Sequence, residues 1–382
     1  MKLNILLFVL VIIMVSCTEK KLTPIQLTCE YLENPSVVDI KKPRLAWINI
    51  ANEGDRGQKQ TAYQIRVASS EDKLSSPDLW DSQKIESDQS FRVEYNGKQL
   101  NSRQECWWQI RVWDKNDNVS DWSEPAMWRM GLLNKSDWES KWIGAPWQGE
   151  EALPKPSGGP DGLPTELPPP APLLRKDFNI VKKVEKAVAF VTGLGYFELY
   201  LNGKKVGDDV LVPNQTNYGK RPELANEYIS VEDNFRKYKV MYLAYDIKDQ
   251  LLKGENTIGS ILGNGFYNAP KYWTRSYGSP RFLCQVHVTY SDGTEEVIVS
   301  DESWKISKSA ILTDLVYHGE HYDARLEQPG WNTSGFDDSA WENAIQRKAP
   351  DGELVAHTAH PDKVSKLIVP VSIEKTEDGI YK

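Results

Sequence analysis

The stretch ECWWQIRVWD, from Glu105 to Asp114, decides the fold class because its apolar and polar residues alternate. In an extended chain, successive side chains point to opposite faces, so every second residue shares a face. The face that the pattern makes apolar carries Cys106, Trp108, Ile110 and Val112. This period of two predicts a half-buried β-strand rather than a helix.

The same pattern extends outward from this stretch. In TAYQIRVAS, residues 61–69, Tyr63, Ile65 and Val67 alternate with Gln64, Arg66 and Ala68. Hairpin signals separate alternating runs at Asn96-Gly97, Asn202-Gly203 and Asp292-Gly293. The helix candidates are short, such as residues 245–252, where Asp246 could cap a turn. The chain is therefore predicted to be all-β.

This 382-residue chain divides into three blocks after its first 23 residues. Residues 24–130 carry strands at short spacing, as in an immunoglobulin-like or fibronectin type III sandwich. Residues 137–345 form a second β block with a proline-rich insert, residues 148–172, that is expected to be an extended loop. Residues 346–382 are expected to be the truncated start of a further β domain.

The charge of the chain argues against a nucleic-acid partner. The formal net charge is −8, and phosphate binding requires a clustered basic face that this sequence lacks. The 14 Trp and 17 Tyr outnumber the 9 Phe. Trp and Tyr combine an apolar face with a hydrogen-bonding edge, which suits both sugar sites and sandwich cores, so composition leaves both uses open.

The first 17 residues, MKLNILLFVLVIIMVSC, read as a signal peptide. The apolar run is too short to span a bilayer, and its end at Cys17 resembles a bacterial lipoprotein cleavage site. This resemblance implies lipidation of Cys17 and membrane anchoring through the lipid, whereas ordinary cleavage would leave Cys17 unmodified or removed. Thr18 in place of an aspartate favours the outer membrane, so we expect a secreted, lipid-anchored protein on its periplasmic or cell-surface face.

The other three cysteines are Cys29, Cys106 and Cys284. Their number is odd, and none belongs to a CxxC pair. Cys106 and Cys284 lie in apolar alternating stretches, which predicts buried free thiols and gives no metal framework.

An ordered set of segments resembles the N-terminal half of bacterial α-L-rhamnosidases of glycoside hydrolase family 78. These segments are PRLAW (43–47), AYQIRVA (62–68), LWDS (79–82), WWQIRVWD (107–114), VTGLGYFELYLNGKKVGD (191–208), DIKDQLLKGENTIGSILGNGFYN (246–268) and GEHYDARLEQPGWNTSGFDDSAW (319–341). The resemblance implies a modular enzyme with a sandwich, a galactose-binding-like jelly roll, a further β domain and an (α/α)6 barrel. It also implies inverting hydrolysis of terminal α-L-rhamnosyl linkages by two glutamates of the barrel, as an acid and a base.

The chain departs from this family pattern in one respect. It contains no acidic catalytic motif of the type DCPQRDE and no succession of amphipathic helices that could build the barrel. We therefore expect the non-catalytic N-terminal modules of the enzyme, acting as carbohydrate-binding or scaffold modules, with doubtful glycosidase activity of their own.

The segment GEHYDAR, residues 319–325, is a candidate catalytic site because it carries two carboxylates. If it is extended, Glu320 and Asp323 face opposite sides and cannot flank one bond, whereas Asp323 and Arg325 can form an ion pair. The spacing of His318 and His321 is not that of a helical zinc motif, and the pair His357 and His360 has no more support. The segment is expected to be structural.

The resemblance also implies a sugar site, since some family members carry a rhamnose-binding module that uses calcium. The matching loops here are PNQTNYGKR (213–221) and GNGFYNAP (263–270). The candidate carbohydrate-binding residues are Asn217, Tyr218, Asn264, Phe266, Tyr267 and Trp273. Asn217 and Asn264 are the candidate ligands of a possible Ca²⁺, which prefers oxygen donors. Alternatively, these loops are scaffold that packs against another domain.

Three other roles remain open. A stand-alone surface lipoprotein would bind a rhamnosylated glycan or polysaccharide without turnover. A protein-interaction role through the first sandwich would require a protein partner and no affinity for sugar. An inert truncated product would be unstable, because unpaired strand edges are prone to aggregation.

Overall fold

A computed structural model of the protein describes residues 22–150, 169–219, 238–268, 277–316 and 319–380. The predicted signal peptide with Cys17, together with Trp273 and His318, lies outside these residues. The described residues form β-strands and four 3-10 turns, namely Glu71–Ser75, Lys135–Asp137, Lys248–Gln250 and Ala324–Leu326. Among them, no helix is long and apolar enough to cross a membrane. The all-β prediction is confirmed.

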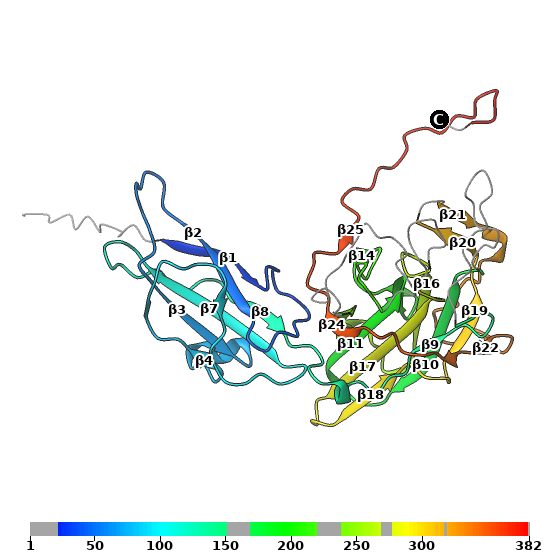
Figure 1. Ribbon diagram of the computed structural model, residues 1–382, viewed down its shortest axis with the longest axis horizontal. Helices are drawn as coiled ribbons and strands as arrows, with labels where there is room; N and C mark the ends of the chain where they lie inside the picture. The colour runs from blue at the N-terminus through cyan, green and yellow to red at the C-terminus, as the bar shows by residue number, and fades with distance from the viewer. Residues whose placement is uncertain (1–21, 151–168, 220–237, 269–276, 317–318, 381–382) are drawn as a thin grey trace, which may run out of the picture. The chain divides into compact units, whose positions relative to one another are not determined.

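The chain divides into two compact units. The first comprises the residues up to 34 together with 42–99 and 105–127, and the second comprises residues 35–41, 100–104 and 128 onward. Each unit has its own sheets, and the ribbon in Figure 1 labels most of their strands.

The first unit is built from two small sheets. One sheet has the order β1-β2-β6, with strands Thr23–Cys29, Arg44–Ile50 and Val93–Glu94. The other has the order β4-β3-β7-β8, with β5 also on β3, and its strands are Trp80–Asp81, Ala62–Ala68, Glu105–Trp113, Ala126–Arg129 and Ile85–Glu86. The last two residues of β8 belong to the second unit. Strand β7 alternates buried and half-buried residues along its whole length, as predicted, and Cys106, Trp108, Ile110 and Val112 are all inaccessible.

Two expectations for the first unit are wrong in detail. Strand β3 is predicted to be half-buried, but it is buried on both faces. The buried Gln64 is satisfied there, since it accepts a hydrogen bond from Arg111 at 2.7 Å and donates one to Asp81 at 2.6 Å. Asn96-Gly97 does not join a hairpin, since β6 before it pairs with β2 and not with β7. Gly97 instead allows a close approach, because a Cβ there would lie 2.5 Å from the Cβ of Trp80.

The second unit is a larger sandwich of two sheets. The six-stranded sheet has the order β13-β12-β16-β10-β19-β22, with strands Lys204–Lys205, Tyr196–Leu201, Gly254–Gly263, Pro172–Ile180, Lys305–Lys308 and Glu342–Asn343. The seven-stranded sheet has the order β23-β9-β17-β11-β15-β24, with β18 also on β17, and its strands are Ile345–Gln346, Ile143–Gly144, Arg281–Tyr290, Val184–Leu194, Lys239–Asp246, Glu353–Ala356 and Glu295–Val299.

The core of the second unit lies between these sheets. Phe282 of β17 contacts Phe197 of β12 and Trp304 with ring centroids 6.5 and 5.4 Å apart, and all three rings are buried. Cys284 is buried in the same cluster. Cys29, Cys106 and Cys284 are all buried free thiols, as predicted, and burial raises the pKa of each. A thiol with a raised pKa is a poor nucleophile, so these cysteines act as core residues.

Two of the three hairpin signals hold. Asn202-Gly203 joins β12 to β13 with φ values of 51° and 81°, and Asp292-Gly293 joins β17 to β18. The helix candidate at residues 245–252 is limited to the 3-10 turn Lys248–Gln250, because β15 continues to Asp246. The side chain of Asp246 accepts from the backbone N–H of Lys248 at 3.2 Å.

The sandwich extends beyond residue 345. Strand β24 pairs in parallel with β15, and β25 (Asp362–Lys363) pairs with β14 (Asp209–Val210). Most of the proline-rich insert lies outside the described residues, but its last residue, Pro172, begins β10. A proline is tolerated at the first residue of a strand, where the N–H that it lacks is not needed for pairing.

Candidate functional site

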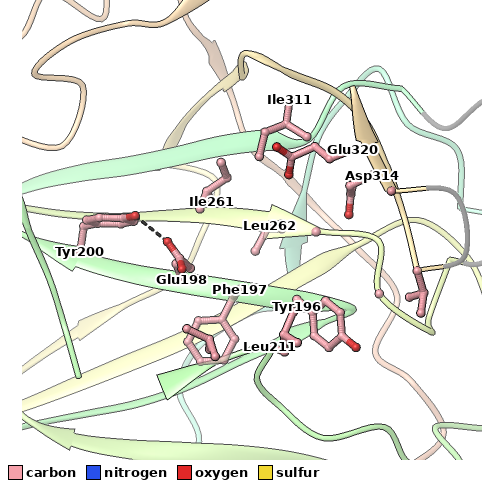
Figure 2. Close-up of a pocket in the computed structure, with 15 residues that line it drawn as sticks. Tyr196, Phe197, Glu198, Tyr200, Leu211, Ile261, Leu262, Ile311, Asp314 and Glu320 are labelled. Carbon is pink, nitrogen blue, oxygen red and sulfur yellow. Dashed lines mark hydrogen bonds between the residues drawn. The ribbon is translucent and has the colours of Figure 1, made fainter. Parts of the chain in front are cut away.

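An open cleft of about 570 Å³ lies in the second unit, beside the ends of β12 and β16. The hairpin of β20 (Ile311–Leu315) and β21 (Gly319–Tyr322) contributes one side of it, where Figure 2 labels Ile311, Asp314 and Glu320. Val210 of β14 and the adjacent Leu211 also line the cleft. Much of the lining is aliphatic, from Val210, Leu211, Ile261, Leu262, Ile311 and Val316. The remaining side chains of the lining are the aromatic residues Tyr196, Phe197 and Tyr200 and the acidic residues Glu198, Asp314 and Glu320.

Glycines bring two chain segments together at this cleft. Gly195 has a φ of 107°, and a Cβ there would lie 2.1 Å from the carbonyl oxygen of Gly263. Gly265 also has a positive φ, 49°, and its Cβ would lie 3.0 Å from the backbone of Gly195. Only glycine tolerates both the positive φ and the close approach, so Gly195 and Gly265 allow the two segments to come together.

On the β12 side, Glu198 is held between two partners. Its carboxylate accepts from the Tyr200 hydroxyl at 2.6 Å and from Lys205 Nζ at 2.7 Å. The edge of the Tyr200 ring packs on Trp331, with centroids 5.6 Å apart. Burial and the hydrogen bond to Glu198 raise the pKa of Tyr200, so its hydroxyl stays a donor at neutral pH.

On the hairpin side, Asp314 is tied to the GNG turn. One carboxylate oxygen accepts from the backbone N–H of Asn264 and the other from its side-chain Nδ2, both at 2.6 Å. The side-chain oxygen of Asn264 in turn accepts from Asn268 Nδ2 at 2.7 Å. Asp314 lies directly opposite Glu320 in the β20–β21 register. Burial, with a smaller contribution from the negative charge of Glu320, raises the pKa of Asp314 to about 6 against the opposing hydrogen bonds of Asn264.

The sequence-predicted sugar residues do not gather in this cleft. Tyr218 and Tyr267 are buried, and their rings pack edge to face with centroids 5.2 Å apart. Tyr277 completes the cluster by stacking on Tyr267 and donating to the side-chain oxygen of Asn217 at 2.9 Å. The rings of Tyr218 and Tyr267 also line a second cavity, of about 160 Å³, with Glu150, Arg281, Lys348 and Asp351. Phe266 is half-buried, and Trp273 lies outside the described residues.

The two candidate calcium ligands are engaged by different partners. Asn217 binds Tyr277, whereas Asn264 is buried and binds Asp314 and Asn268. Within the described ranges, no group of three or more His, Cys, Asp or Glu side chains is arranged to hold a metal ion. Calcium binding by Asn217 and Asn264 therefore stays a prediction.

The GEHYDAR segment is divided between two elements. Residues 319–322 form β21, and Ala324–Leu326 form a 3-10 turn, so the expected extended conformation ends at Tyr322. Asp323 caps this turn and forms the predicted ion pair with Arg325, at 2.5 Å. Sequence reasoning did not single out Glu198 or Asp314. The available signal was a single acidic residue inside an apolar strand, in FELYL and ILTDL.

The fold and the cleft define a class of protein: an immunoglobulin-like sandwich followed by a jelly-roll sandwich that carries an open, partly aromatic cleft. The family model of a Rha78A-like N-terminal immunoglobulin domain matches residues 24–134. The model of the α-L-rhamnosidase N-terminal domain matches residues 182–366. The chain belongs to the α-L-rhamnosidase family and corresponds to its N-terminal domains.

Individual relatives agree with this assignment. An α-L-rhamnosidase of Formosa agariphila is 36% identical over 99% of this chain and 40% of its own length. One of an Alteromonas species is 35% identical over 87% of this chain and 34% of its own length. The solved structure of the α-L-rhamnosidase from Dictyoglumus thermophilum has a TM-score of 0.79 and 37% identity, and it covers 94% of this chain and 38% of its own. The chain thus spans less than half the length of these relatives.

Proposed function

We propose that this chain supplies glycan-holding N-terminal domains of an α-L-rhamnosidase and that the 570 Å³ cleft is where a rhamnosylated glycan binds. The observation that carries the proposal is the composition of the cleft, which pairs an aliphatic and tyrosine-lined wall with a few polar acceptors. Such pockets, of roughly 300–1,000 Å³, are typical of small-ligand sites. A sugar presents C–H faces to apolar and aromatic side chains and hydroxyls to carboxylates, which suits this lining.

A titration of the purified chain with methyl α-L-rhamnoside, followed by NMR or calorimetry, tests the proposal. Saturable binding is expected, and Tyr196→Ala should weaken it by roughly tenfold or more, because a stacking contact is lost. Phe91→Ala is the matched control, since Phe91 is an exposed aromatic residue of the first unit. Absence of binding at millimolar sugar would contradict the proposal.

The same titration with and without added calcium tests the predicted role of Asn217 and Asn264 as calcium ligands.

Hydrolysis in the cleft is the second candidate function. It is favoured by the raised pKa of Asp314, about 6, beside Glu320, because acid–base pairs in clefts have displaced pKa values. Against it, both oxygens of Asp314 accept hydrogen bonds from Asn264, which gives the carboxylate a structural task. We therefore expect no turnover of an aryl α-L-rhamnoside above a mock purification. Turnover that Asp314→Asn abolishes would make the cleft an active site.

We further propose that the chain is anchored at the outer membrane through a lipid on Cys17. The apolar segment before Cys17 supports this proposal, and an anchored binding domain would hold the glycan near the cell. In cell fractionation, Cys17→Ala should move the protein from the membrane to the soluble fraction. An unchanged membrane fraction would contradict lipid anchoring.

A further inference from the structure

The cleft carries negative charge on two of its sides. Glu198 comes from β12, Asp314 from β20 and Glu320 from β21. In the view of Figure 2, the carboxylate of Glu198 lies on one side of Ile261 and Leu262, and those of Asp314 and Glu320 lie on the other. None of the described lining residues is Lys, Arg or His. A ligand in the cleft therefore meets carboxylates on both flanks.

Only one of these three carboxylates has a cationic partner in the described part of the chain. Lys205 binds Glu198 at 2.7 Å and offsets its charge. Asp314 is satisfied by the neutral donors of Asn264, and Glu320, its cross-strand neighbour, is exposed. Like charges directly opposite on paired strands repel each other, so the described residues of the hairpin concentrate negative charge at the cleft and include no cation that offsets it.

We propose that Glu320 and Asp314, with Glu198 opposite, make the cleft selective for charge, so that it accepts uncharged glycans and rejects anionic ones. This inference rests on the proposed function, since it concerns the same cleft. An incoming uronate or sulfate would approach Asp314 and Glu320, which have no cationic partner among the described residues, between low-dielectric aliphatic walls, where Coulomb repulsion is larger than in bulk water. Neutral sugar hydroxyls can instead donate hydrogen bonds to the same carboxylate oxygens, because an ionised carboxylate accepts hydrogen bonds and donates none.

The lining also favours a sugar that carries an apolar group. Leu211 is 56% exposed and Val316 is 40% exposed, although both line the cleft. Covering such side chains by a deoxy carbon or a methyl group contributes binding free energy in proportion to the apolar area removed from water. An uncharged ligand that carries an apolar group therefore fits both the charge and the aliphatic wall of the cleft.

The test compares two disaccharides that differ in one group: α-L-rhamnosyl-glucose and α-L-rhamnosyl-glucuronic acid, each titrated into the purified chain at pH 7. The glucuronate should bind at least about tenfold more weakly, and raising the salt concentration should narrow the difference, because salt screens the repulsion. Glu320→Gln should also narrow the ratio of the two affinities. Glu255→Gln, a change to an exposed glutamate at the other end of β16, should leave the ratio unchanged.

The possible outcomes separate this inference from the proposed function. Equal affinity of the wild-type chain for the two disaccharides would overturn the charge selectivity and leave the glycan site standing. A ratio that Glu320→Gln and Glu255→Gln change alike would also overturn it, because the selectivity would then follow the net charge of the whole chain. Binding of neither disaccharide would overturn the proposed function together with this inference.

Discussion

At the scale of single residues, Asp314 shows how position decides the chemistry of a side chain. It is an ordinary aspartate in sequence, but the hairpin places it partly buried, opposite Glu320 and against Asn264. Burial disfavours the charged form, and here it outweighs the two hydrogen bonds that favour it, so the pKa rises to about 6. The strand pattern marks Asp314 only as an acidic residue in an apolar strand and does not predict its raised pKa, because burial and the neighbouring residues depend on the fold.

This shift predicts a pH dependence of stability. A carboxyl whose pKa is higher in the folded than in the unfolded chain binds more protons when folded, so its contribution to stability falls as pH rises from about 4 to about 6. Asp314→Asn cannot ionise and removes this loss. The unfolding free energy of Asp314→Asn relative to wild type should therefore increase by about 2 kcal/mol from pH 4 to pH 7.

Urea unfolding of both proteins at several pH values measures this difference. Asp292→Asn is the control, because Asp292 is an exposed turn residue whose pKa is lowered by hydrogen bonds to Thr294 and Lys182. The control should show no such increase over the same range. A flat difference for Asp314→Asn would mean that Asp314 is well solvated in the folded chain.

At the scale of elements, Arg175 of β10 attaches the loop that follows the GEHYDAR turn to the six-stranded sheet. Its side chain is 1% exposed, and it donates to the carbonyl oxygens of Trp331 and Thr333 at 2.9 and 3.1 Å. It also forms ion pairs with Asp177 and Asp338. Trp331 then packs over β16 where Gly259 leaves room, since a Cβ there would lie 2.6 Å from its ring.

Arg175→Met should destabilise the second unit by about 2–4 kcal/mol. The change removes the cation from two carboxylates and the donor from two carbonyl oxygens. Breaking a buried pair from one side costs roughly 3–5 kcal/mol, here reduced because Asp177 is half exposed and keeps its hydrogen bond from the Thr257 hydroxyl. Thermal or urea unfolding measures the loss. Lys183→Met, at an exposed position after β10, should change stability by less than about 0.5 kcal/mol. A loss no larger than that of the control would contradict the attachment role.

The same elements show what sequence can predict of this fold and of its cleft. The alternation in β7 predicts its buried face, because one pattern of hydrophobicity settles which side packs. The burial of Gln64 and the position of Asn96-Gly97 depend on partners from distant segments, Arg111 and β2, which no local pattern encodes. The position of the cleft could not be predicted for the same reason. Tyr218 and Tyr267, the predicted stacking residues of the sugar site, instead pack against each other.

At the scale of the whole molecule, the ordered family segments predicted what the local patterns could not. The first family match, residues 24–134, lies mostly in the first unit, and the second, residues 182–366, lies in the second unit. These units contain the immunoglobulin-like and jelly-roll folds that the resemblance implied. Strand order is a property of the whole chain, since β10 pairs with β16 and β19, far apart in sequence. A family resemblance carries that order, whereas residue periodicity does not.

The segment after β25 yields the last prediction. Residues 364–373 are rich in apolar side chains that lie in water: Leu367, Ile368 and Val369 are 82%, 76% and 73% exposed, and Val371 is fully exposed. Side chains that bury no area add no hydrophobic stabilisation, so deleting residues 364–382 should leave the melting temperature of the second unit within about 2 °C. Exposed apolar, β-prone segments promote association, so the deletion should also reduce self-association in light scattering.

The control deletion of residues 351–382 removes β24 and β25 as well and should lower the melting temperature clearly, because β24 pairs with β15. A similar loss in both deletions would show that residues 364–382 stabilise the fold.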